Sequence, residues 1–424
     1  MCPPGLRASR DRSSLPAMPG PLEGIRVLDL TRVLAGPMAT QTLADLGAEV
    51  IKIERPGGGD DTRAWGPPFL EAQGGGATSD STYFAACNRG KKSVTLDISK
   101  PAGRDIVRRL AMQSDVLAEN YKVGDLARHG LDYASMHALN PRLVYCSITG
   151  YGQSGPYGSR AGYDPIAQAM GGLMSVTGER DGVPGAGPQR VGVAVTDMMT
   201  AIYAVSGILA ALFQRTRSGE GQHIDLALLD VQVASMINIA QAYLSAGVVA
   251  RRNGNAHPSV VPSQTFRCAD GEVMLVAGND SQFAKLCEAA GRPELARDKR
   301  FATNAARVRN QALLIETLQG LLQEHPVAWW TERLANAGVP CGPINDIAHV
   351  FADPQVRHRG MQIELTHPVA GPLALVGSPL RLSETPVAYG LPPPLLGQHT
   401  AEVLGSLLGM EQEEIVRLRE SGVV

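Results

Sequence analysis

Residues 25–54 read IRVLDLTRVLAGPMATQTLADLGAEVIKIE, and this stretch decides the fold expected for the first half of the chain. The apolar run at 25–30 is typical of a buried strand. A helical pattern follows, with Pro37 near its start and Gly47 as the residue that ends it. The second apolar run, at 48–54, predicts another strand. A strand, a helix and a strand in this order form a βαβ unit, which implies a parallel sheet.

The same alternation continues along the first half of the chain. Apolar runs at 93–98, 115–120 and 143–148 predict strands, and residues 101–112 and 134–139 predict helices. The expected fold class is therefore α/β, with a doubly wound, Rossmann-like large domain. Ligands of such sheets bind beyond the carboxyl ends of the strands, which here selects residues 33–35, Arg55, 96–99 and 120–122.

Residues 150–155, GYGQSG, satisfy the GxGxxG pattern of dinucleotide-binding sites. That pattern requires a helix to open at the second glycine, whereas a proline and further glycines follow here. We therefore interpret the stretch as a turn. The first loop, 31–36, also lacks the pattern, which argues against a nicotinamide enzyme. At the end of the second strand, Arg55 could hold a ribose phosphate or remain a solvated surface charge.

Two aspartates stand at predicted helix starts between Tyr163 and Gln214. Asp164 precedes Pro165, the usual order of an N-cap and the first helical residue. Asp197 precedes a long apolar helical run, with Thr196 as a competing cap. A carboxylate at a helix N-terminus is stabilised in its charged form, so both are expected to be ionised at neutral pH. Ionised carboxylates can be nucleophiles, but the residues alone favour two helix caps.

After residue 222 the pattern changes to that of a smaller α+β domain. A D-G turn between strand-like runs predicts a hairpin within 265–279, and helices are expected at 281–290, 312–322 and 329–337. The remaining chain is irregular and is expected to return to the first domain. The predicted organisation is a disordered tail at 1–20, the large domain at 21–222, the small domain at 223–338 and the return at 339–424.

Composition limits the kinds of partner. The chain has 424 residues, with 39 basic and 41 acidic side chains, and a net charge of −2 gives no general attraction to nucleic acid or to a membrane. Its six cysteines and nine histidines show no metal-binding spacing, so neither a metal site nor a disulfide framework is expected. The uncharged stretch Val231–Ala250 carries polar residues throughout, which predicts a buried or interface helix and not a membrane span.

The first 17 residues contain three arginines among serines and prolines. They fit a disordered tail, an upstream start codon with Met18 as the true start, or a weak mitochondrial presequence. The scattered cysteines favour a reducing compartment. We therefore expect a cytoplasmic protein, with the mitochondrial matrix as the alternative.

Eight motifs occur in one order along the chain: LEGIRVLDLTRVLAGP, GAEVIKIERPGGGDDTRAWGPP, NRGKKSVTLD, ENYKVGDLARHGL, ITGYGQSGP, GILAAL, VPCGPI and PPLLGQHT. Together they resemble the class III CoA-transferases, the family of formyl-CoA and carnitine CoA-transferases, over residues 21–424. Within it, CSITGYGQSGP, RAGYD and PPPLLGQHT look most similar to the succinyl-CoA:glutarate branch. The resemblance implies a Rossmann-like domain built from both chain ends, a small domain, and two chains interlocked as a homodimer.

The resemblance also assigns roles. Asp197, just before the GILAAL helix, matches the family nucleophile, which forms a mixed anhydride and then an aspartyl-CoA thioester. CoA is thus a substrate, and no permanently bound cofactor is implied. The implied CoA contacts are Leu34, Ala35, Arg55, Leu96, Asn120, Tyr121 and Arg128. The implied acyl pocket contains Trp65, Tyr83 and Tyr163, with Asp164 beside it.

The same resemblance leaves a choice of substrates and of reaction. We expect CoA to pass from an acyl-CoA, such as succinyl-CoA, to a dicarboxylate such as glutarate, with Arg63, Arg89 or Arg160 as candidates for pairing with a distal carboxylate. The glycine-rich lid of formyl-CoA transferase is replaced by residues 253–258, where His257 could touch the acceptor. The alternative, an α-methylacyl-CoA racemase, would need a histidine where this chain has Tyr163.

Overall fold

A computed structural model describes residues 20–424, and its chain divides into two compact units. The described part of unit 1 comprises residues 20–167, Ala194–Ser235 and Arg359–Val424. Unit 2 comprises Gln168–Val193 and Met236–His358. The tail expected at the N-terminus lies outside the described residues, apart from residue 20.

Unit 1 is built on a six-stranded sheet in the order β5-β2-β1-β6-β7-β8, in which every neighbouring pair is parallel. The predicted parallel α/β fold is therefore confirmed. The strands are β1 Arg26–Leu30, β2 Glu49–Glu54, β5 Lys91–Thr95, β6 Val116–Glu119, β7 Val144–Thr149 and β8 His223–Ala227. The helices that connect them are α1 Ala35–Asp45, α3 Pro101–Met112, α4 Tyr133–Leu139 and α7 Val195–Ser218.

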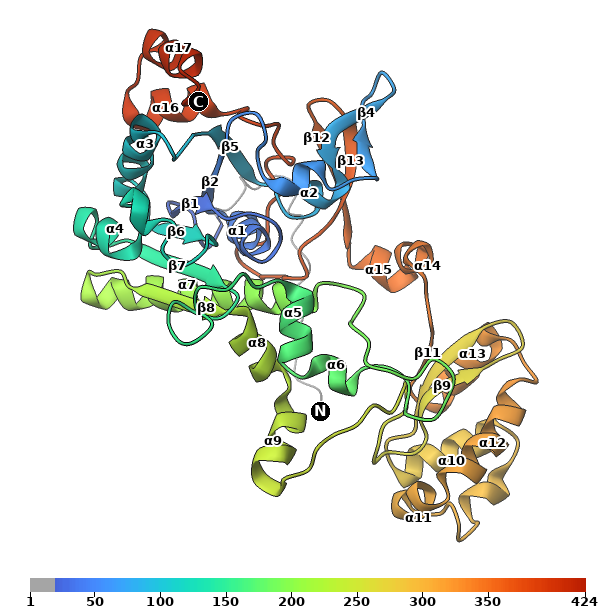
Figure 1. Cartoon of the computed structure of the whole chain (residues 1–424). Helices are drawn as coiled ribbons and strands as arrows, with labels where there is room; N and C mark the ends of the chain where they lie inside the picture. Colours follow the sequence, from blue (N-terminus) through green and yellow to red (C-terminus); the bar gives the residue numbers. More distant parts are fainter. Residues whose placement is uncertain (1–19) are drawn as a thin grey trace, which may run out of the picture. The chain divides into compact units, whose positions relative to one another are not determined.

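The sheet is buried on both faces because its strands are apolar at successive positions. Neighbouring side chains of a strand point to opposite faces, so Val27 and Leu28 of β1 enter different cores. Leu28 packs in the core that contains residues of α3 and α4, whereas Val27 packs in the core under α1 and α7. Figure 1 shows helices on both sides of this sheet.

Helix α7 is the longest element of unit 1, at 24 residues. By length and composition it could cross a membrane, the one such helix among residues 20–424. It nevertheless packs along α1 and under β7 and β8, and it buries Ala204, Ile208 and Ala211 in the core. It ends at Gly219, whose φ of 78° is the left-handed conformation usual after a helix. We therefore interpret α7 as the core helix that carries Asp197.

The C-terminal segment contains regular elements where its sequence pattern is irregular. His399 and Ser93 exchange two hydrogen bonds of 3.1 and 2.9 Å, which fix α16 beside the edge strand β5. A hairpin of β12 and β13 packs against α2 in a small separate core (Figure 1). The C-terminal elements are β12 Gln362–His367, β13 Gly371–Val376, α16 Thr400–Leu408 and α17 Gln412–Glu420. The remaining short elements of unit 1 are η1 Asp61–Ala64, β3 Phe69–Glu71, β4 Ala77–Ser81, α2 Thr82–Ala86 and η2 Ala127–His129.

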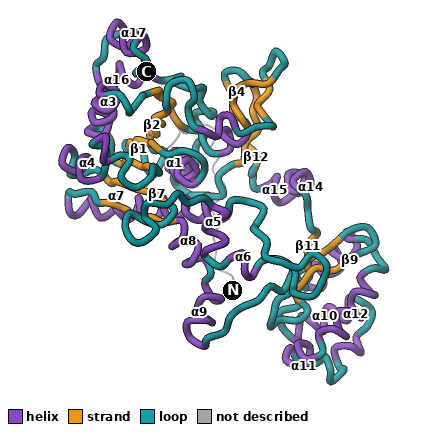
Figure 2. The backbone as a smooth tube through the Cα atoms, viewed as in Figure 1, coloured by secondary structure: helices purple, strands orange, loops and turns teal. Residues whose placement is uncertain are grey.

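Unit 2 has a three-stranded antiparallel sheet in the order β11-β10-β9, covered by helices (Figure 2). The predicted hairpin forms at Asp270-Gly271, between β9 Ser263–Arg267 and β10 Glu272–Val276. The third strand, β11 Cys341–Pro343, was not predicted. The helices are α6 Leu173–Val176, α9 Ile237–Ala246, α10 Asp280–Ala289, η3 Pro293–Ala296, α11 Asn304–Arg309, α12 Gln311–Leu322, α13 Val327–Ala337, α14 Ile347–Ala352 and α15 Pro354–His358.

Sequence expectations differ from the structure at the domain bounds and in two helices. Strand β8 and helix α8 Leu228–Ser235 lie in unit 1, although a second domain was expected to start at 223. Residues 168–193 and 339–358 lie in unit 2, although they were assigned to the large domain and to the C-terminal return. The stretch 231–250 is not one helix but is divided between α8 and α9 at Ile237, whose φ is 37°. Asp197 is the third residue of α7 and not its cap, because the helix begins two residues earlier, at Val195.

Candidate active site

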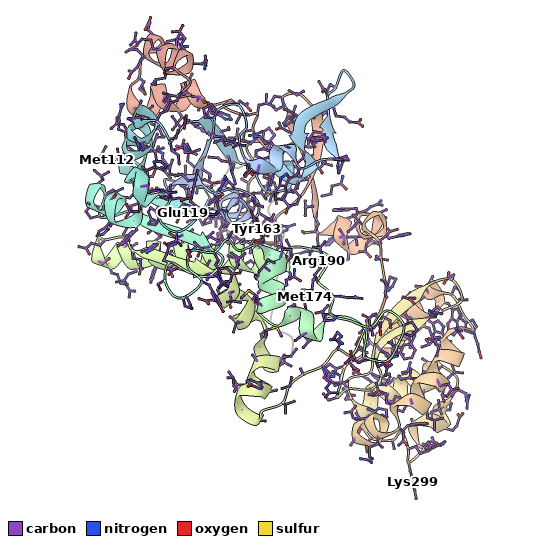
Figure 3. All side chains as sticks on the ribbon, in the orientation of Figure 1. Met112, Glu119, Tyr163, Met174, Arg190 and Lys299 are labelled. Atoms are coloured by element: carbon purple, nitrogen blue, oxygen red, sulfur yellow. The ribbon has the colours of Figure 1, made fainter. Side chains whose placement is uncertain are left out.

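A cavity of about 190 Å³ opens at the carboxyl ends of β1, β6 and β7, and we call it the aspartate cavity. In a parallel sheet these strand ends share one edge, so segments far apart in sequence meet there. Figure 3 labels Tyr163, which lies just before α5 Asp164–Met170. The predicted site residues that line this cavity are Leu34, Ala35, Asn120, Tyr121, Tyr163, Asp164 and Asp197.

The two aspartates have different positions and different partners. Asp164 Oδ1 accepts hydrogen bonds from the backbone N–H of Thr196, at 2.8 Å, and of Asp197, at 3.3 Å. It therefore caps α7 from outside that helix, a role that no local sequence pattern indicates. The Thr196 hydroxyl donates to Gln232 on α8, which fixes the first turn further. These contacts place the Asp197 carboxyl on the cavity wall.

The electrostatics of Asp197 correct the prediction that it is readily ionised. Burial, and after it the charge of the nearby Asp164 carboxylate, raises the pKa of the Asp197 carboxyl to about 7. The helix N-terminus does not offset these effects, because Asp164 occupies the N–H group of Asp197 itself. The carboxyl is thus a stronger base than a solvated aspartate, and it is ionised only in part near neutral pH.

Tyr83 and Trp65 are adjacent but do not line the aspartate cavity. Their rings meet edge to face with centroids 5.4 Å apart. Burial raises the pKa of the Tyr83 hydroxyl to about 12, and the charge of Asp197 is the next largest cause. Tyr83 therefore lies within electrostatic range of the carboxyl, and its hydroxyl stays protonated as a hydrogen-bond donor.

A second cavity, of about 250 Å³, lies at the ends of β2 and β5, and we call it the arginine cavity. Its lining contains the remaining predicted CoA contacts, together with Tyr121: Arg55, Leu96 and Arg128. Arg55 is 69% exposed and has one weak contact, 3.5 Å from its Nη2 to Asp61 Oδ1. Arg128 is also exposed and pairs with Asp125. Both guanidinium groups are accessible to an anion from solvent.

The loop between β1 and α1 is held in an unusual backbone conformation. Val33 has a φ of 73°, which is a strained value for a β-branched residue. Asp60 Oδ1 accepts from the Val33 N–H at 3.2 Å, and the other Asp60 oxygen accepts from the buried Lys52 ammonium at 2.9 Å. Burial of Lys52, Asp60 and Glu54 behind the loop was not predicted. The sequence does carry a signal for this burial, because Lys52 and Glu54 alternate with apolar residues in the strand VIKIE.

The structure corrects the suggested partners for a distal carboxylate. Arg63 is buried and pairs with Glu54, at 2.7 Å, and with Asp80, at 2.8 Å. Arg89 is buried and pairs with Asp45 at 2.6 Å. Both suggestions are therefore wrong, because these guanidinium groups are already neutralised inside the fold. Arg160 does line the aspartate cavity, with its guanidinium 4.0 Å from the centroid of the Tyr157 ring.

The glycine-rich stretch 150–155 forms bends and turns, and the next helix starts only at Asp164. The prediction that it is no dinucleotide-binding helix start is confirmed. Its first glycine serves close packing, since a Cβ on Gly162 would lie 2.4 Å from the Cα of Gly150. In unit 2, the ring of His257 accepts a hydrogen bond from the Ser259 N–H at 3.1 Å. No group of three or more metal-ligating side chains occurs within residues 20–424.

The sequence profile of CoA-transferase family III matches residues 22–400 of the chain. The chain belongs to CoA-transferase family III. This transferase is 49% identical over 404 residues to a succinate–glutarate CoA-transferase of Agrobacterium fabrum, covering 94% of this chain and 99% of that protein. It is 46% identical over 420 residues to a succinyl-CoA:glutarate CoA-transferase of mouse, covering 99% of this chain and 94% of that protein.

Solved structures agree with the fold of the transferase. A CAIB/BAIF family protein from Brucella suis has a TM-score of 0.83 and 46% sequence identity, covering 92% of this chain and all of that one. A second relative, Rv3272 from Mycobacterium tuberculosis, has a TM-score of 0.78 and 32% identity, covering 90% and 99% of the two chains. The transferase is therefore an α/β enzyme that transfers CoA.

Proposed function

We propose that this transferase moves CoA from an acyl-CoA donor such as succinyl-CoA to a dicarboxylate such as glutarate, with Asp197 as the nucleophile. The observation that carries the proposal is the partly buried Asp197 carboxyl, which has a raised pKa and lies on the wall of the aspartate cavity. The adjoining arginine cavity contains accessible arginines. Relatives named for succinyl-CoA and glutarate cover almost the whole chain, which supports the choice of substrates.

The reaction proceeds in two halves that mirror each other. An Asp197 oxygen attacks the thioester carbonyl of the donor, the C–S bond breaks, and a mixed anhydride and CoA thiolate form. The thiolate then attacks the Asp197 carbonyl of the anhydride, which releases the donor acid as a carboxylate and leaves an aspartyl-CoA thioester. The acceptor carboxylate repeats these steps in reverse, which yields the new thioester and the free Asp197 carboxylate.

The surroundings of Asp197 fit this chemistry. A carboxylate with a raised pKa is weakly solvated and more nucleophilic than an exposed one. Once the anhydride forms, the negative charge of Asp197 is lost and its unfavourable interaction with Asp164 is relieved. The acyl group would extend beyond the aspartate cavity to Tyr83 and Trp65, which do not line that cavity. There the protonated Tyr83 hydroxyl would donate to the carbonyl oxygen of the acyl group, and Trp65 and Tyr163 would border the acyl chain.

CoA would extend across both cavities. Leu34, Ala35, Asn120 and Tyr121 would contact the pantetheine arm in the aspartate cavity. Leu96, Arg55 and Arg128 would contact the nucleotide in the arginine cavity, with Arg55 on the 3′-phosphate. Arg160 lines the aspartate cavity and not the arginine cavity, and it would pair with the distal carboxylate of the acceptor.

Two further features belong to the proposal. The chain forms an interlocked homodimer, which the exposed apolar surface of α9 supports. The enzyme works in the cytoplasm or, as the alternative, in the mitochondrial matrix, and five unpaired cysteines among the described residues suit either reducing compartment.

Trapping of the covalent intermediate tests the proposal. Wild type and Asp197→Asn are incubated briefly with succinyl-CoA, treated with hydroxylamine, and analysed by intact mass and peptide mapping. A hydroxamate at Asp197 that the variant lacks is the expected result. Exchange of the α-proton on a branched acyl-CoA, with no adduct, would instead indicate a racemase. Transfer from succinyl-CoA to monocarboxylates alone would refute the dicarboxylate preference.

A further inference from the structure

Arg32 stands where the two cavities adjoin. It follows β1, and its side chain lines both the aspartate cavity and the arginine cavity. Tyr121 also lines both, and the Arg32 guanidinium carbon lies 5.0 Å from the centroid of the Tyr121 ring. A ligand that occupies both cavities must therefore pass this arginine.

The Arg32 guanidinium is only partly satisfied by hydrogen-bond acceptors. Its Nε is buried and has no partner among the residues that the structure describes. Its Nη1 is 3.3 Å from Asp61 Oδ2, and Asp61 is shared with the exposed Arg55. Because buried N–H groups of native proteins are nearly always hydrogen-bonded, this donor indicates an acceptor that a ligand supplies.

The backbone of Arg32 is already fixed for binding. Asn120 Oδ1 accepts from the Arg32 N–H at 2.9 Å, and Asn120 Nδ2 donates to the Arg32 carbonyl at 2.7 Å. The next residue, Val33, is held in its strained conformation by Asp60. Since the base of the side chain does not need to be ordered on binding, the entropic cost of engaging a ligand is reduced.

We infer that Arg32 binds the diphosphate of CoA at the junction of the two cavities. The inference rests on the proposed function and adds a residue to it. A CoA thioester whose nucleotide occupies the arginine cavity and whose acyl group reaches Asp197 has its diphosphate between the two. A guanidinium suits this group because its planar N–H donors match the phosphate oxygens in pairs.

A distal carboxylate of the acyl group is the competing ligand for Arg32. The positions of the two cavity arginines favour the diphosphate. Arg160 lines the aspartate cavity only, whereas Arg32 also faces the arginine cavity, away from the acyl end of the substrate. The two arginines therefore bind different ends of the thioester.

Truncated ligands separate these roles. Isothermal titration of CoA and of dephospho-CoA, which lacks the 3′-phosphate, is compared for wild type, Arg32→Gln, Arg55→Gln and Arg160→Gln. We expect Arg32→Gln to weaken both ligands equally, by roughly ten-fold or more, the usual range for a lost charge-assisted contact. We expect Arg55→Gln to weaken CoA alone, to the level of dephospho-CoA, and Arg160→Gln to weaken neither.

Kinetics with S-succinylpantetheine, which has no diphosphate, provide the second measurement. Arg32→Gln and wild type should use it equally well, and Arg32→Lys should recover part of the affinity for CoA. Unchanged CoA binding in a folded Arg32→Gln enzyme would overturn the inference. So would weaker binding of succinyl-CoA with normal binding of CoA, which would assign Arg32 to the acyl carboxylate. Failure of wild type to bind CoA would refute the proposed function instead.

Discussion

At the scale of single residues, Asp164 and Asp197 form a coupled pair in which one carboxylate hinders ionisation of the other. In the proposed mechanism only ionised Asp197 attacks the thioester, so kcat/KM should fall as the pH drops below about 7. In Asp164→Asn the like charge is gone, while the amide oxygen still accepts from the Thr196 N–H. We expect the acidic limb of the pH profile to move to lower pH by roughly one unit.

The measurement is the pH dependence of kcat/KM for succinyl-CoA, followed from acid to alkaline pH across the acidic limb. Asp164→Ala serves as the comparison, because it removes both the charge and the cap of α7 and should also lower the melting temperature. An acidic limb that stays in place in Asp164→Asn would show that Asp164 does not control the ionisation of Asp197.

The same burial predicts a stability cost of the ionised Asp197. Its folded-state pKa of about 7 exceeds its ordinary value of 3.8, so the folded state binds the proton more tightly than the unfolded state. The stability that this group contributes is therefore fully present below pH 3.8 and is lost as the pH rises to about 7. Asp197→Asn avoids that loss, which amounts to at most about 4 kcal/mol.

Thermal unfolding at several pH values checks this expectation. Asp197→Asn should melt at a higher temperature than wild type above the folded-state pKa of about 7, and the difference should shrink as the pH is lowered below it. Asp164→Asn is the comparison: it keeps Asp197 and removes only the like charge, so it should recover only part of the difference. An Asp197→Asn enzyme no more stable than wild type in alkaline buffer would contradict a raised pKa.

At the scale of elements, the loop after β7 is positioned by contact between two glycines. A Cβ on Gly162 would lie 2.4 Å from the Cα of Gly150, a distance that requires the backbone to move. Because Gly162 directly precedes Tyr163 and Asp164, Gly162→Ala should displace both. We expect transferase activity to fall roughly ten-fold or more, the order of effect that an ångström of misplacement produces.

The control for that variant is Gly192→Ala, near the start of α7, where an added Cβ meets nothing within 4 Å. It should retain activity, as judged by initial rates with succinyl-CoA and glutarate. Full activity in Gly162→Ala would show that the loop tolerates a shift and does not position the aspartates.

Elements with local sequence signals were predicted well. The helix 101–112 matches α3 because Pro101 marks its start and its apolar residues recur at helical spacing. The hairpin of β12 and β13 was missed although QIELTH at 362–367 alternates polar and apolar residues; the α2 segment that it packs against lies far away in sequence. The cap of α7 was missed for the same reason, since its acceptor lies 33 residues upstream of Asp197.

The site residues were likewise predicted where the signal was local and missed where the partner came from a distant segment. Strand ends placed Leu34, Arg55 and Asn120 at the two cavities, because parallel strands present their carboxyl ends at one edge. Charge alone misassigned Arg63 and Arg89, since their buried carboxylate partners come from other segments. A sequence pattern gives the type of side chain but not the opposite charge that already neutralises it.

At the scale of the whole molecule, the exposed apolar side chains of α9 predict self-association. Leu244 is 76% exposed and Ile237 is 74% exposed in the single chain. Burial of such side chains is worth roughly 1.5–3 kcal/mol each, so a second copy that covers them gains substantial stability. We expect wild type to sediment as a homodimer of two 44.9-kDa chains at micromolar concentration.

Analytical ultracentrifugation of Leu244→Asp tests whether α9 lies in that interface, because a charge there would have to be buried without a partner. The variant should dissociate to monomers or lose soluble yield. Val416→Asp, at an exposed position of α17 in unit 1, is the matched control and should remain dimeric. A monomeric wild type would refute the homodimer, whereas a fully dimeric and active Leu244→Asp would place the interface elsewhere on the chain. In the proposed interlocked homodimer, folding depends on assembly, so the variant should also unfold at a temperature that rises with protein concentration, which wild type at saturating concentration would not show.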